Sequence, residues 1–398
     1  MADTEIQLAR VALTLLAEPG TRAVHRLVAR HGPREALAMA LAGEIPDDTA
    51  RAAVAARLAA GDPRPAAEAA LATGVRLGAR LVVPEDSDWP PGLAALEQVR
   101  LSASDRRVDR EMAPPLCIWA RGEWALADAF DRSVAIVGSR AATQYGEHVA
   151  TDLAYGLAER EWTVVSGGAF GIDAAAHRGS LAAGGLTVAV LACGIERAYP
   201  VANTALFDRI AETGLLITEW PPGADPLRPR FLIRNRVIAA ATRGTILVEA
   251  AARSGATQTM RRAIAMQRPA MVVPGPVTSA MSVGCHEILR QYDAARLVAN
   301  VSHVLEEVGR IGADLAPPLS GPEHPRDQLD DEATFVLESL PRRGAISPDA
   351  AAIRAGVDIR TALRKLTMLE TLGFVTRRDG GYALTPAPRR RAGEDDPP

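Results

Sequence analysis

The chain has 398 residues, of which 48% are hydrophobic and 23% charged, and its formal net charge is −3. These values are ordinary for a globular protein of roughly two or three domains, and the net charge neither predicts nor excludes a nucleic-acid partner. Cys117, Cys193 and Cys285 are widely spaced and form no C-x-x-C pair, which excludes a cysteine zinc site or a disulfide framework. The sequence has no signal peptide and no apolar run of about twenty residues. We therefore expect a cytoplasmic protein with no membrane partner, no metal and no cofactor.

Residues 1–78 are predicted to form a small helical module. Apolar residues recur at helical spacing from Ile6 to Leu16 and from Val24 to Val28, and Pro19-Gly20 separates the two runs. We expect this module to pack or to contact another protein. Contact with a DNA backbone through the turn between helices is the alternative.

Residues 79–310 are predicted to form an α/β domain. A proline- and aromatic-rich lead-in with one or two short strands runs to about residue 122, and a regular alternation of β-rich runs and helices begins at Ser133. The β-rich runs are residues 133–137, 163–165, 187–191, 215–218, 245–248, 270–273 and 296–298. Short apolar strands that alternate with helices indicate a parallel sheet covered on both faces. The expected fold is therefore doubly wound, with a mainly parallel sheet.

The end of the chain is predicted to hold a linker, a second small domain and a disordered tail. Residues 311–330 are rich in proline and read as the linker, and residues 387–398 as the tail. Residues 331–386 combine three helical runs with two short β-runs around Asp379-Gly380-Gly381, which is the pattern of a winged helix. Its third helix offers Arg360, Arg364 and Lys365, and binding to duplex DNA and binding to protein are equally expected.

The stretch from Trp162 to Asp173 reads as a strand, a tight glycine turn and a helix. Ser166, Gly167 and Gly168 form the turn, which would place backbone N–H groups at a helix N-terminus, where an anion is favoured. The glycine spacing does not match the dinucleotide fingerprint, and the chain has no G-x-x-x-x-G-K-S/T motif. An alternative is that the glycines serve only close packing of strand and helix.

Small residues follow six of the predicted strands, and ligands of doubly wound sheets bind at the carboxyl ends of the strands. Gly138-Ser139-Arg140 follows the first strand, and Ser254-Gly255 comes shortly after the fifth. We expect a long groove into which Arg140 reaches. The preference of such turns for glycine and serine in any protein accounts for part of this pattern.

The segment from Arg228 to Arg243 contains five arginines around Phe231, and no acidic residue lies between Asp225 and Glu249. Arginines that follow phosphates and a ring that stacks on a base are what a single strand of nucleic acid requires. A solvated helix face with Phe231 in the core is the alternative.

Several motifs together resemble the DprA/Smf family of DNA-processing proteins. They run in order over residues 133 to about 298 and comprise Val134–Arg140 with Tyr145-Gly146, Ser166–Asp173 with Ala176-His177, Gly194 with Tyr199-Pro200, Phe231 with Arg234-Asn235-Arg236, Glu249 with Ser254-Gly255, and Val273-Pro274-Gly275. The resemblance implies an extended Rossmann-like domain that binds single-stranded DNA, dimerises and helps to load RecA on incoming DNA during natural transformation. It implies no catalysis.

By position, the resemblance implies a DNA site made of Ser139, Arg140, Ser166, Gly167, Gly168, Arg228, Phe231, Arg234, Asn235 and Arg236. The chain departs from the family pattern at Leu232-Ile233, where a proline and a second basic residue are common, and this weakens the positive charge beside Phe231. Asp173 and His177 resemble a catalytic acid and base, but their i, i+4 spacing suggests that they cap and brace the glycine turn.

Two other functions remain as hypotheses. Nucleotide hydrolases of the LOG phosphoribohydrolase type have similar glycine loops, although this chain lacks their P-G-G-x-G-T-x-x-E string. A structural adaptor that works through its helical ends and binds no nucleic acid is the third hypothesis.

Overall fold

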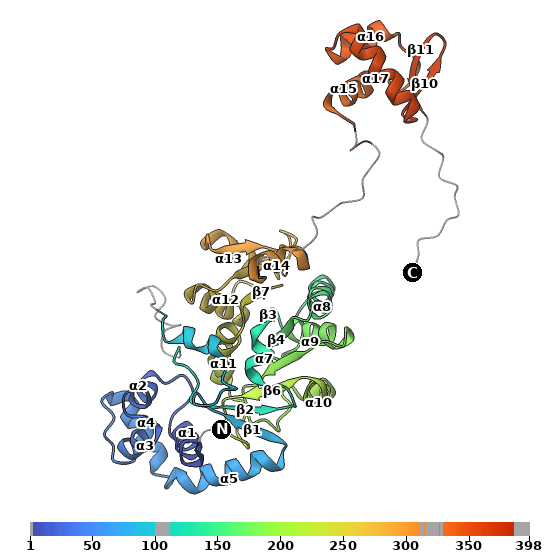
Figure 1. The fold of residues 1–398 in the computed structure, drawn as a ribbon. Helices are drawn as coiled ribbons and strands as arrows, with labels where there is room; N and C mark the ends of the chain where they lie inside the picture. Colours follow the sequence, from blue (N-terminus) through green and yellow to red (C-terminus); the bar gives the residue numbers. More distant parts are fainter. Residues whose placement is uncertain (1–2, 100–111, 311–313, 315–325, 327–328, 386–398) are drawn as a thin grey trace. The chain divides into compact units, whose positions relative to one another are not determined.

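The computed structural model describes residues 3–99, 112–310, 314, 326 and 329–385 (Figure 1). The chain divides into two compact units, residues 1–316 and residues 317–398. The predicted helical module and the predicted α/β domain thus belong to one compact unit. The predicted tail lies outside the described residues, and so does the predicted linker except for residues 314, 326, 329 and 330. The domain boundaries drawn from the sequence stay a prediction.

A nine-stranded sheet forms the centre of the first unit. Its strands are β1 Ala79–Val82, β2 Ile118–Arg121, β3 Ser133–Val137, β4 Thr163–Ser166, β5 Thr187–Val190, β6 Leu215–Thr218, β7 Gly244–Leu247, β8 Ala270–Val272 and β9 Ala295–Leu297. Their order is β1-β2-β6-β5-β4-β3-β7-β8-β9, and only the pairs β1–β2 and β2–β6 are antiparallel. The prediction of a mainly parallel α/β sheet is confirmed.

Helices cover both faces of this sheet (Figure 1). They are α7 Leu126–Asp131, α8 Gln144–Ala158, α9 Ile172–Ala182, α10 Thr204–Thr213, α11 Arg228–Ala241, α12 Gly255–Ala265, α13 Val283–Gln291 and α14 Val301–Val308, with short 3₁₀ turns η1 Pro91–Leu96 and η3 Val201–Asn203. Val134 and Ile136 of β3 pack with α8, α9 and α14, whereas Ala135 and Val137 pack with α11, α12 and α13. This alternation explains why four successive positions of β3, Val134 to Val137, are apolar.

Five helices precede the sheet and pack on the outer end formed by β1 and β2 (Figure 1). They are α1 Thr4–Leu16, α2 Arg22–His31, α3 Pro33–Leu41, α4 Asp48–Leu58 and α5 Pro63–Arg76. Trp119 of β2 is fully buried in their core, and a Cβ on Gly74 of α5 would lie 2.4 Å from its ring. Glycine at position 74 therefore allows α5 to approach the sheet.

The described residues of the second unit form three helices and a hairpin. These are α15 Asp331–Ser339, α16 Pro348–Ala355 and α17 Ile359–Thr371, followed by the antiparallel strands β10 Val375–Arg378 and β11 Gly381–Leu384. Leu337, Leu366 and Tyr382 are among the residues of its own buried core. Among the helices of the described residues, none has the length and hydropathy to cross a membrane.

Candidate functional site

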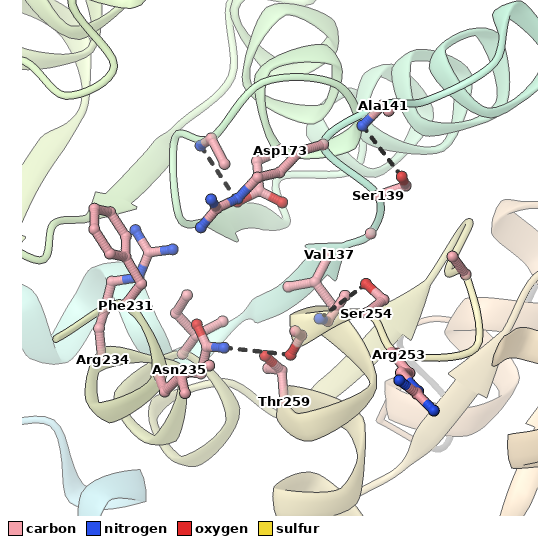
Figure 2. Close-up of a pocket in the computed structure, with 18 of the residues that line it drawn as sticks. Val137, Ser139, Ala141, Asp173, Phe231, Arg234, Asn235, Arg253, Ser254 and Thr259 are labelled. Atoms are coloured by element: carbon pink, nitrogen blue, oxygen red, sulfur yellow. Dashed lines mark hydrogen bonds between the residues drawn. The ribbon is translucent and has the colours of Figure 1, made fainter. Parts of the chain in front are cut away.

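A pocket of about 540 Å³ lies where β3 and β7 end (Figure 2). The chain runs from β3 to β4, β5 and β6 on one side of β3, and it places β7 and β8 on the other. The carboxyl ends of β3 and β7 therefore form the topological switch point, where sheets of this class bind ligands. The side chains that line the pocket come from the turn after β3, the turn after β4, helix α11 and the loop before α12.

Ser139 and Arg140 form one wall of the pocket. The N–H of Ser139 donates to the carbonyl oxygen of Glu249 at 2.7 Å, and its Oγ accepts from the N–H of Ala141 at 3.2 Å. The first bond ties the turn after β3 to the loop after β7, and the second lies within the turn. Ser139 is buried, whereas Arg140 beside it is exposed, so Arg140 is the residue of this wall that can reach a ligand.

Phe231 projects from the first turns of α11 into this pocket. Its ring centroid lies 5.4 Å from Cζ of Arg140, 5.8 Å from Cζ of Arg234 and 5.3 Å from the ring centroid of Tyr199. Tyr199 is 44% exposed, and Phe170 in the glycine turn is 47% exposed. The pocket thus combines a partly exposed ring with cations, the arrangement expected for stacking on a base.

The turn after β4 is braced by side chains of the protein itself. The N–H groups of Gly167 and Ala169 donate to Oδ2 of Asp173 at 3.2 and 3.4 Å, and Oγ of Ser166 donates to the carbonyl oxygen of Ile136 at 2.6 Å. The prediction that Asp173 braces this turn agrees with these bonds. The carboxylate thereby occupies two of the N–H groups that were expected to bind an anion.

The glycines of this turn are required for packing inside the protein. A Cβ on Gly167 would lie 2.1 Å from Nη2 of Arg234, and a Cβ on Gly168 would lie 2.4 Å from the ring of Phe207. Gly168 also has a φ of +68°, a backbone conformation that residues other than glycine rarely adopt. The glycines therefore make room for protein side chains, and the binding of DNA by this turn stays a prediction.

Arg234 is buried at the inner side of the pocket (Figure 2). Its Nη1 donates to the carbonyl oxygens of Gly167 and Val190, the latter at 2.8 Å. Burial lowers the pKa of Arg234, and the nearby charge of Asp173 opposes this effect. Burial also raises the pKa of Asp173, against the opposing charge of Arg234. Arg234 therefore stabilises the glycine turn in addition to facing the pocket.

The remaining wall comes from α11 and the loop before α12. Asn235 donates from Nδ2 to the carbonyl oxygen of Gly255 at 3.5 Å, and Oγ of Ser254 accepts from the N–H of Ala256 as the N-cap of α12. Figure 2 shows Arg253 on this loop, at the far end of the pocket from Phe231 in this view. Arg253 is exposed, so it supplies a second accessible cation.

Three arginines of the predicted basic segment are held in ion pairs. Arg230 pairs with Glu18, Arg236 with Glu219 and Arg243 with Asp131. Arg236 is fully buried and its partner is 3% exposed, so its expected contact with DNA is incompatible with this geometry. Burial raises the pKa of Glu219, and the charge of Arg236 opposes that rise. The Arg236–Glu219 pair is part of the protein core.

The ten predicted site residues therefore fall into two sets. Ser139, Arg140, Phe231, Arg234 and Asn235 line the pocket. Ser166, Gly167, Gly168, Arg228 and Arg236 do not line it, although Arg228 is exposed at the start of α11. Sequence reasoning missed Arg253, whose signal was its place directly before Ser254-Gly255.

His177 does not have the surroundings of a catalytic base. It is fully buried, and its Nδ1 lies 2.7 Å from Oγ1 of Thr187. Burial lowers the pKa of His177 to about 3, and the charge of Arg234 acts in the same direction. In the part of the chain that the structure describes, no group of three or more His, Cys, Asp or Glu side chains is placed to hold a metal ion.

The sequence is similar to DNA-processing proteins over most of its length. A family model described as DNA recombination-mediator protein A matches residues 80–309. A relative from Mycobacterium tuberculosis that carries the name DNA processing protein DprA is 42% identical over 375 residues, which cover 94% of this chain and 92% of the relative. Protein Smf of Escherichia coli is 32% identical over 308 residues, 76% of each chain.

The fold is similar to a solved member of the same group. The X-ray structure of DNA processing protein A from Streptococcus pneumoniae superposes with a TM-score of 0.61 and 29% identity, and the match covers 77% of this chain and 99% of that one. The agreement of the family model, the relatives and this fold shows that the chain belongs to the DprA/Smf family of DNA processing proteins.

Proposed function

We propose that this protein binds single-stranded DNA in the pocket between β3, β7 and α11, protects the strand and helps to load RecA on it. The observation that carries the proposal is the partly exposed ring of Phe231, with Arg140 at 5.4 Å, inside a pocket at the switch point of the sheet. An aromatic ring can stack on a base only when the base is unpaired and turned outward, so this geometry favours a single strand over a duplex.

The charge of the pocket supports an anionic ligand. Its lining contains the arginines Arg140, Arg234 and Arg253, and Asp173 is its one acidic side chain. Arg140 and Arg253 come from different turns and are both exposed, so each can contact a phosphate while a base lies near Phe231. Guanidinium groups suit this role because they donate in a fork that matches phosphate oxygens.

The partners in the proposal come from the family. The matching family model is described as a recombination mediator, which supports delivery of the bound strand to a recombinase, and RecA is the recombinase that we propose. We also propose that the protein acts as a homodimer, and that α15 to α17 with the β10–β11 hairpin form a winged helix. Residues of α17 such as Arg360 are exposed and available to a partner.

The proposed function is non-enzymatic. His177 is buried, has a pKa held near 3 and contacts Thr187, while Asp173 holds the glycine turn. Neither side chain is arranged to transfer a proton to a bound nucleotide. Release of free base from nucleoside monophosphates on incubation with the protein would favour the LOG-type hydrolase instead.

Fluorescence anisotropy with a labelled single-stranded oligonucleotide and the matching duplex, over a series of salt concentrations, tests the proposal. We expect tighter binding of the single strand and a log–log salt slope of roughly −1.4, the value for two phosphate contacts on a single strand, one at Arg140 and one at Arg253. Arg140→Ala should weaken binding and reduce the slope. Equal or tighter binding of the duplex, with Arg140→Ala unchanged from wild type, would refute the proposed site.

A further inference from the structure

Glu18 joins the N-terminal helices to the helix that carries Phe231. It lies in the turn between α1 and α2, and its carboxylate accepts hydrogen bonds from three side chains. Arg57 of α4 donates at 2.8 Å, Nη2 of Arg230 in the first turn of α11 at 2.9 Å, and Nε1 of Trp220 after β6 at 3.0 Å. Two of these donors thus belong to the sheet region, outside the N-terminal helices.

Both of these donors are close to Phe231, one along the chain and one through packing. Arg230 is its neighbour in the chain, and Phe231 packs against a small buried cluster that contains Trp220 and Ile233. The guanidinium of Arg230 also lies over the ring of Trp220, at 5.5 Å from its centroid. A single carboxylate therefore restrains the residue before Phe231 and an indole that belongs to the cluster against which Phe231 packs.

The electrostatics show that the carboxylate is charged in this arrangement. Burial acts to raise the pKa of Glu18, but hydrogen bonds from Arg230 and Trp220 hold that pKa below its ordinary value. The side chain of Arg230 is 14% exposed. Without Glu18, this partly buried cation would lose its counter-charge, and it would move toward solvent to regain hydration.

We infer that Glu18 is a positioning residue for nucleic-acid binding: through Arg230 and Trp220 it holds the Phe231 end of α11 in place, so the N-terminal helices contribute to the site without lining the pocket. This inference rests on the proposed function. It gives the N-terminal helices a role that neither the pocket nor the resemblance assigns to them.

The primary test is the affinity of Glu18→Gln for a single-stranded oligonucleotide. Glutamine is close to glutamate in shape but lacks the charge, and we expect Kd to rise by about threefold to tenfold, within the range for coupled neighbouring residues. The salt slope should not change, because the Glu18→Gln substitution removes no phosphate contact. Glu85→Gln is the matched control, since it makes the same change in charge at a carboxylate of similar exposure that pairs with Arg10 of α1.

A double-mutant cycle with Phe231→Ala separates positioning from general loss of structure. If Glu18 acts through the ring, Glu18→Gln should cause no further loss of affinity in the Phe231→Ala background. Arg230→Gln should resemble Glu18→Gln, with an unchanged salt slope, and the two changes combined should cost no more than either alone. Trp220→Phe, which keeps a ring but removes the N–H donor, gives a second variant should Glu18→Gln not fold.

The outcomes distinguish this inference from the proposed function. If wild type prefers single-stranded DNA and Phe231→Ala weakens binding, but Glu18→Gln matches Glu85→Gln or adds fully to Phe231→Ala, the positioning role is wrong and the binding site stands. A salt slope that falls with Arg230→Gln would show that Arg230 is itself a phosphate contact and would also overturn the inference. If wild type binds no single-stranded DNA, both conclusions fail together.

Discussion

The pocket has a mouth, formed by Arg140, Phe231 and Arg253. We compare it with an inner group formed by Asp173 and Arg234, which line the pocket, and by His177, which does not. At the mouth the two arginines are exposed, whereas every member of the inner group is at least nine-tenths buried. The inner side chains form hydrogen bonds within the protein. Asp173 accepts from two backbone N–H groups, Arg234 donates to two carbonyl oxygens, and His177 bonds to Oγ1 of Thr187.

This difference shows that residue type does not decide which side chains of a strand-end site can bind a ligand. A buried polar group whose hydrogen bonds are made within the protein stabilises the fold and is costly to disturb. An exposed one is available to a ligand and contributes little to stability. Substitutions in the inner group should therefore change mainly the free energy of unfolding, and substitutions at the mouth should change mainly the affinity for DNA.

The largest effect is expected from Arg234→Ala. It removes the donors to the carbonyl oxygens of Gly167 and Val190 and leaves the buried carboxyl of Asp173 without a nearby cation. We expect the free energy of unfolding to fall by about 3 kcal/mol or more, as when one partner of a buried charged pair is removed. Urea unfolding followed by tryptophan fluorescence measures it, since all five tryptophans lie in residues 1–316.

Arg140→Ala is the control for that measurement. It removes the same kind of side chain from the mouth, where its loss should change the free energy of unfolding by no more than about 0.5 kcal/mol. Equal destabilisation by the two variants would contradict the division between mouth and inner group.

Phe231→Ala should weaken the binding of DNA strongly and reduce the free energy of unfolding only moderately, the reverse of what we expect for Arg234→Ala. Loss of a stacking ring weakens single-strand binding by about 1–3 kcal/mol per base, which is roughly fivefold to 150-fold in Kd. The ring is only partly buried, so the loss of stability should be smaller than for Arg234→Ala. Anisotropy titration and urea unfolding of the same preparation give both numbers. A variant that binds DNA like wild type would show that Phe231 is a core residue. That result would favour the alternative interpretation of the sequence, a solvated helix face with Phe231 in the core.

The inner group also predicts a dependence of stability on pH. The folded pKa of His177, about 3, lies below the value of about 6.5 expected in the unfolded chain. The unfolded state therefore binds a proton as pH falls below 6.5 while the folded state does not, so stability is present above pH 6.5 and is lost on acidification. Between pH 6.5 and pH 5 the loss from this group should be about 1–2 kcal/mol.

His177→Gln isolates that contribution. Buried carboxyl groups such as Asp173 titrate in both proteins, so only the difference between wild type and variant reports His177. We expect this difference in the free energy of unfolding to shrink by about 1–2 kcal/mol as pH falls from 6.5 to 5. A constant difference over this range would show that His177 is accessible to protons in the folded state.

The sheet could be predicted closely because its signal is local. The strands at Ser133–Val137 and Leu215–Thr218 have the bounds expected from the sequence, since short apolar runs between glycine-rich turns leave little choice of position. The edge that carries the pocket followed from the rule that carboxyl ends of parallel strands meet at one edge. Five of the ten expected site residues do line that pocket.

The ion pairs of Arg230 and Arg243 in the basic segment could not be predicted, because their partners are distant in the chain. The segment Arg228–Arg243 contains no acidic residue, yet Glu18 lies 212 positions from Arg230 and Asp131 lies 112 positions from Arg243. Only the tertiary fold brings these counter-charges to the arginines. Local charge patterns count the cations of a helix correctly but do not show which of them the fold has already neutralised.

The smallest effect should come from Arg253→Ala at the mouth. Arg253 is exposed and, if it contacts one phosphate, its loss should raise Kd by about twofold to fivefold, as for an exposed ion pair. The magnitude of the salt slope should fall by about 0.7, the value for one phosphate on a single strand. Arg209→Ala makes the same change in net charge on α10, outside the pocket. If both variants shift Kd alike with no change in slope, Arg253 acts only through the overall field of the protein, and the mouth then extends from Arg140 to Phe231 alone.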